Sequence, residues 1–295
     1  MSEPSIQCPC RGEFEVPTYT YEAPPAGETL FDFGAKYRRA YTRCGLCGHW
    51  FSRNDMDLSA IYSGAYVDAT YGTRMRATYD RIMALPSERS DNAGRVARVE
   101  AFAKSYLPSS GRPPSLLDIG SGLAVFPARM REAGWRCTAL DPDPNAAAHA
   151  RKVAGTEAVV GDFLVMDIST LGPFDVVTLN KVLEHVQDPV EMLRRAARLV
   201  ATHGFVYVEV PDGEMASREG PGREEFFIEH MHVFSMASVA MLAARSGLSV
   251  LAIERLQEPS TKYTLRMFCA PDVQVRQAVS ALSPGGPRAS HIKSA

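Results

Sequence analysis

Short apolar runs separated by stretches of helical periodicity fill the chain from residue 115 onward. The runs that read as strands are LLDIG, RCTALD, AVVGD, FDVVTLN, GFVYVEV, SVLAIERL and TLRMFCA. Helical patterns join the first five, and this alternation indicates right-handed βαβ units and a doubly wound parallel sheet. Only residues 257–263 separate the last two runs, so a hairpin there would make the final strand antiparallel. The pattern predicts an α/β fold with a mostly parallel seven-stranded sheet.

The first of these strands leads into a helix through glycines. In LLDIGSGLAVF, residues 116–126, an apolar run ends in Gly-Ser-Gly, and helical spacing begins after it. Such a turn lets a ligand lie against backbone N–H groups at the helix N-terminus. Asp118, Gly120 and Gly122 form D-x-G-x-G. The dinucleotide fingerprint G-x-G-x-x-G fits less well, because Val125 stands where its third glycine belongs. An ordinary glycine-rich turn would look the same in isolation.

Four of the six cysteines lie in the first 53 residues. They form a C-x-C pair and a C-x-x-C pair, made of Cys8, Cys10, Cys44 and Cys47. Two thiolate pairs far apart in sequence can complete a tetrahedral Cys₄ zinc site, which would be structural because four protein ligands leave no open position. The C-x-C departs from the usual zinc knuckle, so His49 is an alternative ligand. Reduced thiols without metal, or a redox C-x-x-C, are the other interpretations.

The overall composition gives no reason to expect nucleic acid or membranes as partners. The 295 residues include 32 Lys+Arg and 34 Asp+Glu, a formal net charge of −2. The apolar runs are too short to span a bilayer, and MSEPSIQCPC lacks the basic start and apolar stretch of a secretory signal. We therefore expect a cytoplasmic protein, in which clustered cysteines favour metal over disulfides. The isolated Cys137 and Cys269 are expected in the core.

Residues 54–110 are expected to form a helical linker or lid. The aromatic residues Tyr62, Tyr66, Tyr71 and Tyr79 recur there, interleaved with Arg74, Arg76 and Arg81. An amphipathic helix is the simpler interpretation, and a lid whose arginines face an anionic substrate is the alternative. Ser90 or Asp91 can then cap a helix that Pro108 ends. The expected division is a zinc-ribbon-like region (1–53), the linker or lid (54–110), the α/β domain (111–281) and a disordered tail (282–295).

Polar motifs recur at the carboxyl ends of the next predicted strands. Asp141 ends the second strand, where a carboxylate can accept hydrogen bonds from both ribose hydroxyls of an adenosine. Asp162-Phe163 and Asn180 end the third and the fourth. Together with D-x-G-x-G, these motifs resemble the class I S-adenosylmethionine (SAM)-dependent methyltransferases over about residues 111–270. The resemblance implies a Rossmann-like methyltransferase fold and a SAM site made of Asp118, Gly120, Gly122, Asp141, Asp162, Phe163 and Asn180. Asp162 would bind the adenine amino group and Phe163 would flank the ring.

The segment after the fourth predicted strand carries a more specific likeness. Asn180 is followed by KVLEHVQDP, which closely resembles the N-x-V-L-E-H-V-x-D-P segment of the ubiquinone-biosynthesis-like branch of the superfamily. Glu184 and His185 match that segment position by position. Because they are expected to open a helix, we interpret them mainly as structural, with a metal-binding or catalytic role as the alternative.

A candidate acceptor site lies in FFIEHMHVFS, beyond the fifth predicted strand. Glu229, His230 and His232 are its candidate catalytic residues, because methylation of a hydroxyl or a carbon acid needs a base near neutral pH. The alternative is that the histidines only hydrogen-bond the loop. The segment resembles the E-H-x-x-x-F-S motif of the sugar C-methyltransferases of deoxysugar biosynthesis, which carry a catalytic His there and an N-terminal zinc-binding region. Phe227 stands where those enzymes have a catalytic Tyr, and the C-x-C pair is a second departure.

These resemblances predict a SAM-dependent methyltransferase with Zn²⁺ in its N-terminal region and His230 as the preferred base. The expected acceptor is a polar small molecule, foremost an activated, nucleotide-linked sugar, methylated on oxygen or carbon. A non-catalytic SAM-binding scaffold, recruited through the zinc module, is the alternative from another functional class. A nicotinamide oxidoreductase is the alternative among enzymes.

Overall fold

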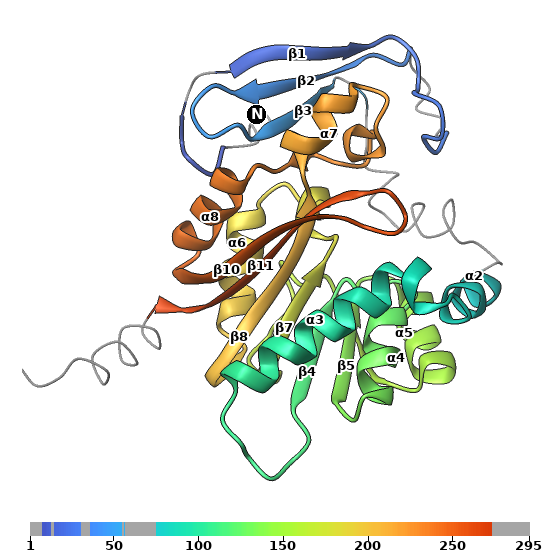
Figure 1. Ribbon diagram of the computed structural model, residues 1–295, viewed down its shortest axis with the longest axis vertical. Coiled ribbons are helices and arrows are strands. Elements are labelled where there is room, and N and C mark those ends of the chain that lie inside the picture. The colour runs from blue at the N-terminus through green and yellow to red at the C-terminus, as the bar shows by residue number, and fades with distance from the viewer. Residues whose placement is uncertain (1–7, 13–14, 31–35, 55, 57–74, 273–295) are drawn as a thin grey trace, which may run out of the picture.

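The computed structural model describes residues 8–12, 15–30, 36–54, 56 and 75–272 of the chain. Its larger part is built on a seven-stranded sheet (Figure 1). The strands, in spatial order, are β10 (Leu248–Gln257), β11 (Tyr263–Pro271), β8 (Val200–Pro211), β7 (Phe174–Asn180), β4 (Ser115–Ile119), β5 (Arg136–Asp141) and β6 (Glu157–Val160). From β8 to β6 every neighbouring pair is parallel. The predicted mostly parallel sheet is therefore confirmed.

The last two strands form the predicted hairpin. β11 lies between β10 and β8 and runs antiparallel to both. On the other side of the sheet, β4 is flanked by β5 and β7, so the order of the parallel strands reverses at this point. Ligands of doubly wound sheets bind outside the carboxyl ends of the strands at such a reversal.

Helices cover both faces of the sheet (Figure 1). The described helices are α2 (Met75–Met83), α3 (Asp91–Tyr106), α4 (Val125–Glu132), α5 (Pro144–His149), α6 (Pro189–Ala197), α7 (Gly213–Glu219) and α8 (Met236–Arg245), of which α7 lies beside the N-terminal strands. Val99 of α3 and Phe126 of α4 belong to one apolar core, whereas Leu193 of α6 and Leu242 of α8 belong to another. These two cores lie on opposite sides of the sheet and bury it from both directions.

Two helix starts follow the capping chemistry of the sequence. Ser90, rather than Asp91, caps α3, because its Oγ accepts the N–H of Ala93 at 3.2 Å. Ser235 caps α8 and forms a reciprocal capping box with Ser238. Both side chains satisfy N–H groups that the first turn of a helix leaves without partners.

One predicted helix is missing, and the prediction that helices join the first five strands is wrong at this place. Residues 161–173, between β6 and β7, contain turns but no helix. Asp162 and Asp167 each accept a backbone N–H from the residue two positions later. Such turns offer the backbone an alternative to helical hydrogen bonds, and Gly172-Pro173 ends the segment.

The N-terminal region forms a second, antiparallel sheet. It consists of β1 (Glu15–Tyr21), β2 (Arg39–Cys44), β3 (Trp50–Asn54) and the short β9 (His232–Val233). Its fourth strand thus comes from the chain beyond β8, through pairs such as Trp50 with Val233. Figure 1 shows this sheet beside α7 and α8. The N-terminal region is therefore continuous with the segment that carries the candidate acceptor site.

Only part of the expected linker or lid falls on the described residues. Tyr62, Tyr66, Tyr71 and Arg74 lie outside them. In α2, Tyr79 is buried and its ring meets that of His149 edge-on, whereas Arg76 pairs with Asp80 on the exposed side of the same helix. This distribution of apolar and charged side chains is that of an amphipathic helix packed on the domain.

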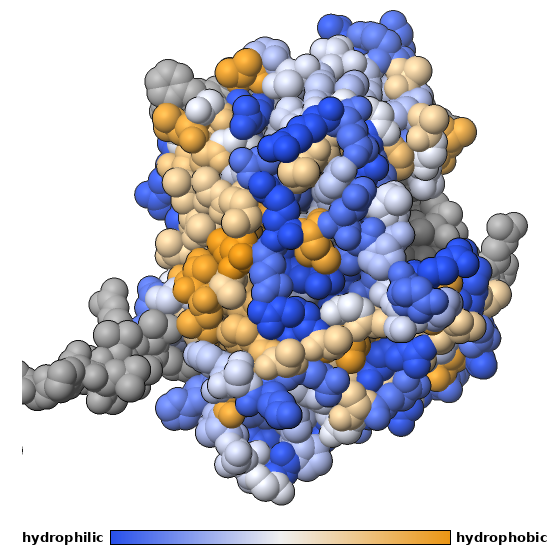
Figure 2. Space-filling view, viewed as in Figure 1, coloured by the Kyte–Doolittle hydropathy of each residue, from blue (hydrophilic) through white to orange (hydrophobic). Residues whose placement is uncertain are grey.

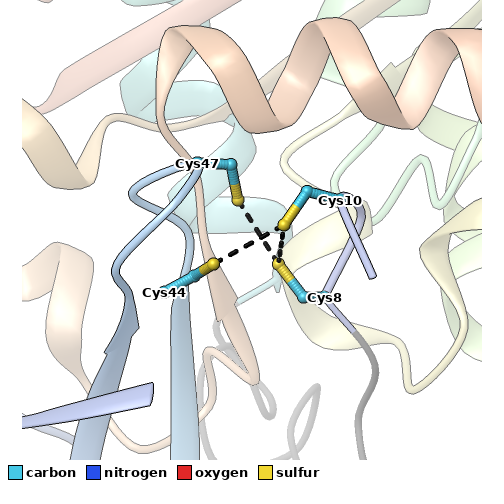
Figure 3. Close-up of side chains that lie close together, drawn as sticks. All are labelled: Cys8, Cys10, Cys44 and Cys47. Carbon is cyan, nitrogen blue, oxygen red and sulfur yellow. Dashed lines mark hydrogen bonds between the residues drawn. The ribbon is translucent and has the colours of Figure 1, made fainter. Parts of the chain in front are cut away.

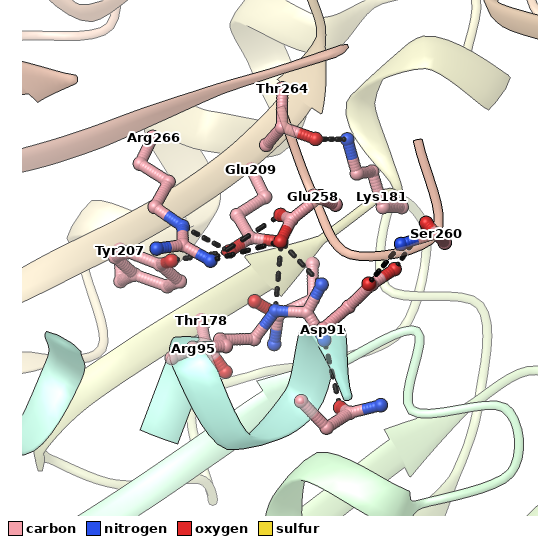
Figure 4. Close-up of polar contacts among 12 residues, drawn as sticks. Asp91, Arg95, Thr178, Lys181, Tyr207, Glu209, Glu258, Ser260, Thr264 and Arg266 are labelled. Carbon is pink, nitrogen blue, oxygen red and sulfur yellow. Dashed lines mark hydrogen bonds and ion pairs between the residues drawn. The ribbon is translucent and has the colours of Figure 1, made fainter. Parts of the chain in front are cut away.

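A buried ionic network ties α3 to the sheet (Figure 4). The carboxylate of Glu209, on β8, accepts hydrogen bonds from Arg95 at 2.8 Å and from Arg266 at 2.9 Å. Tyr207 donates to the same carboxylate at 2.5 Å. The two arginines hold the pKa of Glu209 at about 2 despite its burial. The network therefore joins α3 to β8 and to β11 of the hairpin.

The described surface is mostly hydrophilic on the face that Figure 2 shows, with apolar side chains gathered where α8 and β10 lie in Figure 1. Val250, on the edge strand β10, is among the exposed large apolar residues. Cys137 and Cys269 are buried, as predicted. Among the described helices, none has the length and apolar character needed to cross a membrane.

Candidate functional site

A cavity of about 1140 Å³ opens at the carboxyl ends of the parallel strands. Its walls come from the turns after β4, β5, β6 and β7, from residues 224–230 and from the β10–β11 turn. Small-molecule and cofactor sites are typically concave and of about 300–1,000 Å³. The cavity is therefore large enough for a cofactor together with a second small molecule.

The glycine turn after β4 forms the floor of this cavity. Gly120 has φ of +71°, and an added Cβ would lie 2.7 Å from Val182 Cγ2. Gly122 has φ of +49°, and no described atom lies within 4 Å of where its Cβ would stand. Gly120 is thus required by close packing and a left-handed backbone, whereas Gly122 leaves open space for a ligand.

Asp118 and Asn180 lie together between the ends of β4 and β7. The buried Oδ1 of Asp118 accepts hydrogen bonds from Thr178 Oγ1 and Asn180 Nδ2, both at 2.7 Å. Burial raises the pKa of Asp118 to about 6, against the effect of these hydrogen bonds. The Oδ1 atom of Asn180 is buried and has no hydrogen-bond partner among the described residues. A buried acceptor of this kind suits a ligand that brings a donor.

Asp141 links the end of β5 to the glycine turn. Its Oδ2 accepts the N–H of Gly122 at 2.8 Å, and its Oδ1 accepts the N–H of Asp143 at 2.9 Å. Burial raises the pKa of Asp141. Each carboxylate oxygen retains a second lone pair, so Asp141 can still accept hydrogen bonds from a ligand at the cavity wall.

The predicted adenine contacts lie in different surroundings. Asp162 is exposed, and its Oδ1 accepts the N–H of Leu164 at 2.9 Å. Phe163 is only 2% exposed and belongs to the main apolar core, although it also reaches the cavity wall. Leu164, which the sequence did not single out, lines the cavity beside it.

Glu184, His185 and His230 form a titratable cluster in the cavity wall. One carboxylate oxygen and one ring nitrogen from each histidine lie within 4.8 Å of one another. Nδ1 of His185 lies 2.8 Å from the carbonyl oxygen of Glu229, and Nδ1 of His230 lies 2.9 Å from that of Glu225. Since a carbonyl only accepts, both rings are assigned the tautomer with the proton on Nδ1.

The cluster is tuned by burial. Burial lowers the pKa of both histidines, and the nearby charge of His185 lowers that of His230 further. His230 is therefore neutral at pH 7 and able to accept a proton on Nε2. Burial raises the pKa of Glu184 to about 7, and neither of its carboxylate oxygens has a hydrogen-bond partner elsewhere in the described part of the chain.

Glu184 and His185 differ from expectation because they do not open a helix. They lie in a 3₁₀ turn, Leu183–His185, and α6 begins only at Pro189, capped by Asp188. A proline at the first helical position and an aspartate before it define that later start. The turn aims both side chains at the cavity, which gives them a place in the site rather than in a helix.

Glu229 and His232 flank His230 in the sequence, but the fold places their side chains in different surroundings. Glu229 lines the cavity, and burial raises its pKa. His232 is fully buried in β9, where its Nδ1 lies 2.9 Å from Nε2 of His49. His232 therefore faces the N-terminal region and is absent from the cavity wall. Of the two histidines, only His230 reaches the space where a second substrate would bind.

Lys181 is a cavity residue that the sequence did not identify. It has φ of +59°, a left-handed backbone that is uncommon for lysine, and its Nζ donates to Thr264 Oγ1 at 2.7 Å. Burial lowers its pKa. Lys262 and Tyr263, from the β10–β11 turn, line the same side of the cavity. Backbone strain of this kind is concentrated at functional sites, and no sequence signal announces it.

The four N-terminal cysteines converge on one point (Figure 3). Their sulfur atoms lie within 4.8 Å of one another, and the closest pair, Cys8 and Cys10, is 3.2 Å apart. Zinc–sulfur bonds of about 2.3 Å place tetrahedral ligands about 3.8 Å apart, slightly farther than the 3.2–3.5 Å between these sulfur atoms, so four thiolates that open slightly around an ion suit zinc. The backbone N–H of Gly12 donates to Cys10 Sγ at 3.2 Å, as expected at a thiolate ligand. His49, the alternative ligand, instead contacts Ser238 and His232 and lies outside the cluster of sulfur atoms.

Comparisons with known proteins identify the family and the fold. The sequence model of a family described as "Methyltransferase domain" matches residues 90–253, more than half of the 295-residue chain. A ubiquinone biosynthesis O-methyltransferase of Caulobacter sp. (strain K31) is 35% identical over 122 residues, which are 38% of this chain and 48% of that protein. One from Xanthomonas oryzae pv. oryzae (strain PXO99A) is 33% identical over 98 residues, 32% of this chain and 41% of that protein. The chain thus spans about half the length of the curated relatives it matches.

Solved structures share the fold. Magnesium protoporphyrin IX methyltransferase from Synechocystis PCC 6803, with bound S-adenosylhomocysteine (SAH), superposes with a TM-score of 0.55 and 14% identity, over 71% of this chain and 99% of that one. The 1,6-didemethyltoxoflavin-N1-methyltransferase of Burkholderia thailandensis superposes with a TM-score of 0.50 and 22% identity, over 75% of this chain and 94% of that one. The chain therefore belongs to the methyltransferase-domain family, and residues 90–253 form a SAM-dependent methyltransferase domain.

Proposed function

We propose that the whole chain is an enzyme that transfers a methyl group from SAM to a polar small molecule, with His230 as general base. The observation that carries this proposal is one cavity that combines the glycine turn of β4 with the Glu184–His185–His230 cluster. A cofactor site alone would need the first of these features but not the second. The two together suit an enzyme with a co-substrate on one side and a proton acceptor on the other.

The residues around the glycine turn fit SAM. Asn180 Oδ1, which lacks a donor among the described residues, suits the ammonium group of the methionine part. The second lone pairs of Asp141 suit ribose hydroxyls, and the open space at Gly122 lets the ligand lie against the turn. Asp162 and Phe163 remain our proposal for the adenine end. SAM supplies a methyl group on a sulfonium, which is electrophilic without further activation.

The acceptor end supplies the proton chemistry. His230 is neutral at pH 7, and its Nε2 would take the proton as the new bond to the methyl group forms on the acceptor. Glu184 lies near the imidazole and would stabilise the imidazolium that results, and Glu229 lines the same cavity. Glu184 is buried and both histidines are half-buried, and a bound acceptor would displace water from the cluster and so strengthen these interactions.

We propose an activated, nucleotide-linked sugar as the first acceptor to test. Support comes from the likeness of Glu229, His230, Phe234 and Ser235 to the sugar C-methyltransferase motif and from the polar wall formed by Lys181 and Lys262. A phenolic hydroxyl is the second candidate, because the matched relatives are named as ubiquinone biosynthesis O-methyltransferases. Either acceptor presents an acidic O–H or C–H to the base.

The same cluster could instead hold a divalent ion, because a carboxylate oxygen and two ring nitrogens within 4.8 Å of one another suit such a ligand set. An imidazole that coordinates a metal cannot also accept a proton. Turnover measured after dialysis against EDTA, with and without added Mg²⁺ or Mn²⁺, separates the two roles. Turnover that survives chelation supports the base.

We also propose that Cys8, Cys10, Cys44 and Cys47 bind one structural zinc ion. The convergence of four sulfur atoms and the N–H that Gly12 donates to Cys10 support this assignment. Three of the four cysteines are buried, which suits a closed site without an open position for chemistry.

The test of the proposed function is methyl transfer from SAM labelled in its methyl group. Nucleotide-linked deoxysugars and catechol serve as acceptors, and SAH formation is followed in parallel. Acceptor-dependent SAH together with a labelled product supports the enzyme. SAM binding without SAH formation across the panel favours the non-catalytic scaffold. Titration with NAD(H) excludes the oxidoreductase if no binding is detected.

A further inference from the structure

The short turn that presents His230 to the cavity is held from two sides. The N–H of His230 donates to the carbonyl oxygen of Phe227 at 3.0 Å, which closes the turn. From the segment after β7, the carbonyl of Glu184 accepts the N–H of Met231 at 2.7 Å, and Nδ1 of His185 lies 2.8 Å from the carbonyl of Glu229. These contacts fix one side of the turn to the wall of the cavity.

The other side of the turn is held by the N-terminal sheet. The hydroxyl of Tyr41, on β2, lies 2.5 Å from the carbonyl oxygen of His230 and 3.1 Å from that of Phe227. Tyr41 is fully buried, so no water competes for these carbonyls at that hydroxyl. An added Cβ on Gly27 would lie 3.6 Å from the ring of Phe227, which shows that the N-terminal chain also packs against this cavity residue.

A buried ion pair adds a second anchor. Glu28 accepts the N–H of Ile228 at 2.8 Å and pairs with Arg39 at 2.7 Å, and the side chains of both charged residues are 0% exposed. A buried pair of this kind gives little net stability, and its best-attested use is to specify one arrangement. Here the arrangement that it specifies is the position of the turn.

We propose that Tyr41 is a positioning residue for methyl transfer, whose hydroxyl holds the turn of His230 in place. The expected effect on the rate of methyl transfer rests on the proposed function, whereas the effect on the position of the turn does not. A misplacement of about 1 Å can cost about 100-fold in rate, because reacting groups must be aligned. The N-terminal region is then a part of the active site and not a separable recruiting module.

The test compares Tyr41→Phe with Tyr21→Phe. Tyr21 is also buried in the N-terminal sheet, and its hydroxyl donates to the carbonyl of Pro221 at 2.8 Å, outside the turn. Each variant loses one hydroxyl that contacts backbone carbonyl oxygens, two in the case of Tyr41 and one in that of Tyr21, so the structural effect of losing a buried hydroxyl is common to both. Only Tyr41→Phe releases the turn.

We expect the single-turnover rate of Tyr41→Phe to be at least tenfold lower than that of Tyr21→Phe. The SAM affinity of Tyr41→Phe should stay within twofold of the wild-type value. Tyr41→4-aminophenylalanine, which restores an N–H donor at the same position, is expected to recover most of the rate. It also serves as the second variant if Tyr41→Phe is unstable. Equal rates for the Tyr41→Phe and Tyr21→Phe variants would overturn the proposal.

A second readout does not need the acceptor. In ¹⁵N spectra of the histidine side chains, the His230 signals are expected to move in Tyr41→Phe and to stay in place in Tyr21→Phe. Unchanged His230 signals in both variants contradict the positioning role even if no methyl transfer is found. Shifted signals without any turnover would leave the positioning role standing and reject the proposed function.

Discussion

His230 and His232 are two positions apart in the sequence, yet the fold gives them different surroundings. His230 lies in the cavity wall, whereas His232 is buried against His49 in the N-terminal sheet. The sequence pattern left both as candidate bases, with His230 preferred. The structure gives only His230 a route to a bound acceptor, so the difference between them should appear in kinetics.

We expect His230→Ala to lower kcat by about 10²–10⁴-fold, because that is the usual contribution of a general base, with little change in SAM affinity. His232→Ala should instead lower thermal stability through the loss of its contact with His49, and turnover at a temperature where it stays folded should fall far less. Single-turnover methyl transfer and calorimetric SAM binding check both expectations. An active His230→Ala enzyme beside an inactive, folded His232→Ala enzyme would reverse the assignment.

Asp141 is expected to contribute to SAM binding through charge-assisted hydrogen bonds to two ribose hydroxyls. Such bonds contribute about 1.5–3 kcal/mol each, so Asp141→Ala should weaken SAM binding at least tenfold. The carboxylate also holds the N–H groups of Gly122 and Asp143, so part of the loss reflects a looser glycine turn. Calorimetry on the folded variant measures the affinity. Unchanged affinity would remove Asp141 from the site.

Glu184 should make stability depend on pH. Burial raises its pKa from 4.5 to about 7. Between these two pH values the folded protein keeps a proton on Glu184 that the unfolded chain releases. Stability should therefore fall as the pH rises from about 4.5 through 7. Glu184→Gln does not titrate, and its stability relative to the wild type should increase over that interval, by at most about 3 kcal/mol. Denaturant unfolding at pH 5 and pH 8 measures the difference, and a difference independent of pH would contradict the assignment.

At the scale of elements, the N-terminal sheet joins the methyltransferase domain through β9. Trp50 and Phe51 of β3 pair with residues of β9, and Ser235, which caps α8, donates to the carbonyl of Cys47. The cysteine cluster thus lies at the junction between the sheet and α8. Loss of a metal there should disturb this junction before it disturbs the seven-stranded sheet.

We expect one zinc ion per chain in freshly purified protein, measured by elemental analysis. Cys44→Ser should release the zinc and lower the unfolding temperature, because metal binding and local folding are coupled. Cys137→Ala is the matched control: it removes a buried cysteine outside the cluster and should keep the zinc. Wild-type protein without zinc, or a Cys44→Ser variant that retains it, would reject the site.

At the scale of the whole molecule, the ionic network around Glu209 connects α3, β8 and β11 (Figure 4), and its Arg95 also lines the cavity. Glu209 is fully buried and Arg95 is nearly so, and neutral neighbours complete their hydrogen bonds: Tyr207 donates to Glu209, and Asn92 accepts from Arg95. A second pair between α3 and the hairpin, Arg98 with Glu254, is about one third exposed on both sides. Both pairs join α3 to the seven-stranded sheet, one to β8 and one to β10, so a buried and a partly exposed ion pair of the same helix can be compared.

Glu209→Ala should destabilise the protein by about 3–5 kcal/mol, because it leaves two arginines in the interior without their common partner. Glu254→Ala should cost about 0–1 kcal/mol, because water replaces the lost partner of Arg98. Denaturant unfolding of both variants at neutral pH measures the difference. Similar losses for the two would mean that water reaches Glu209 in the folded protein.

The sequence by itself determined the parallel strands, the final hairpin, the glycine turn, the cysteine pairs and the segment of the candidate base, because these depend on local periodicity and on short motifs. It misjudged residues 161–173, where aspartate turns compete with a helix, and the turn of Glu184 and His185. Only the tertiary structure separated His230 from His232 and revealed Lys181 and Tyr41. Those roles depend on contacts between segments far apart in the chain: Tyr41 and His230 are 189 residues apart. No local pattern records such a contact, because it is set by how the two sheets pack.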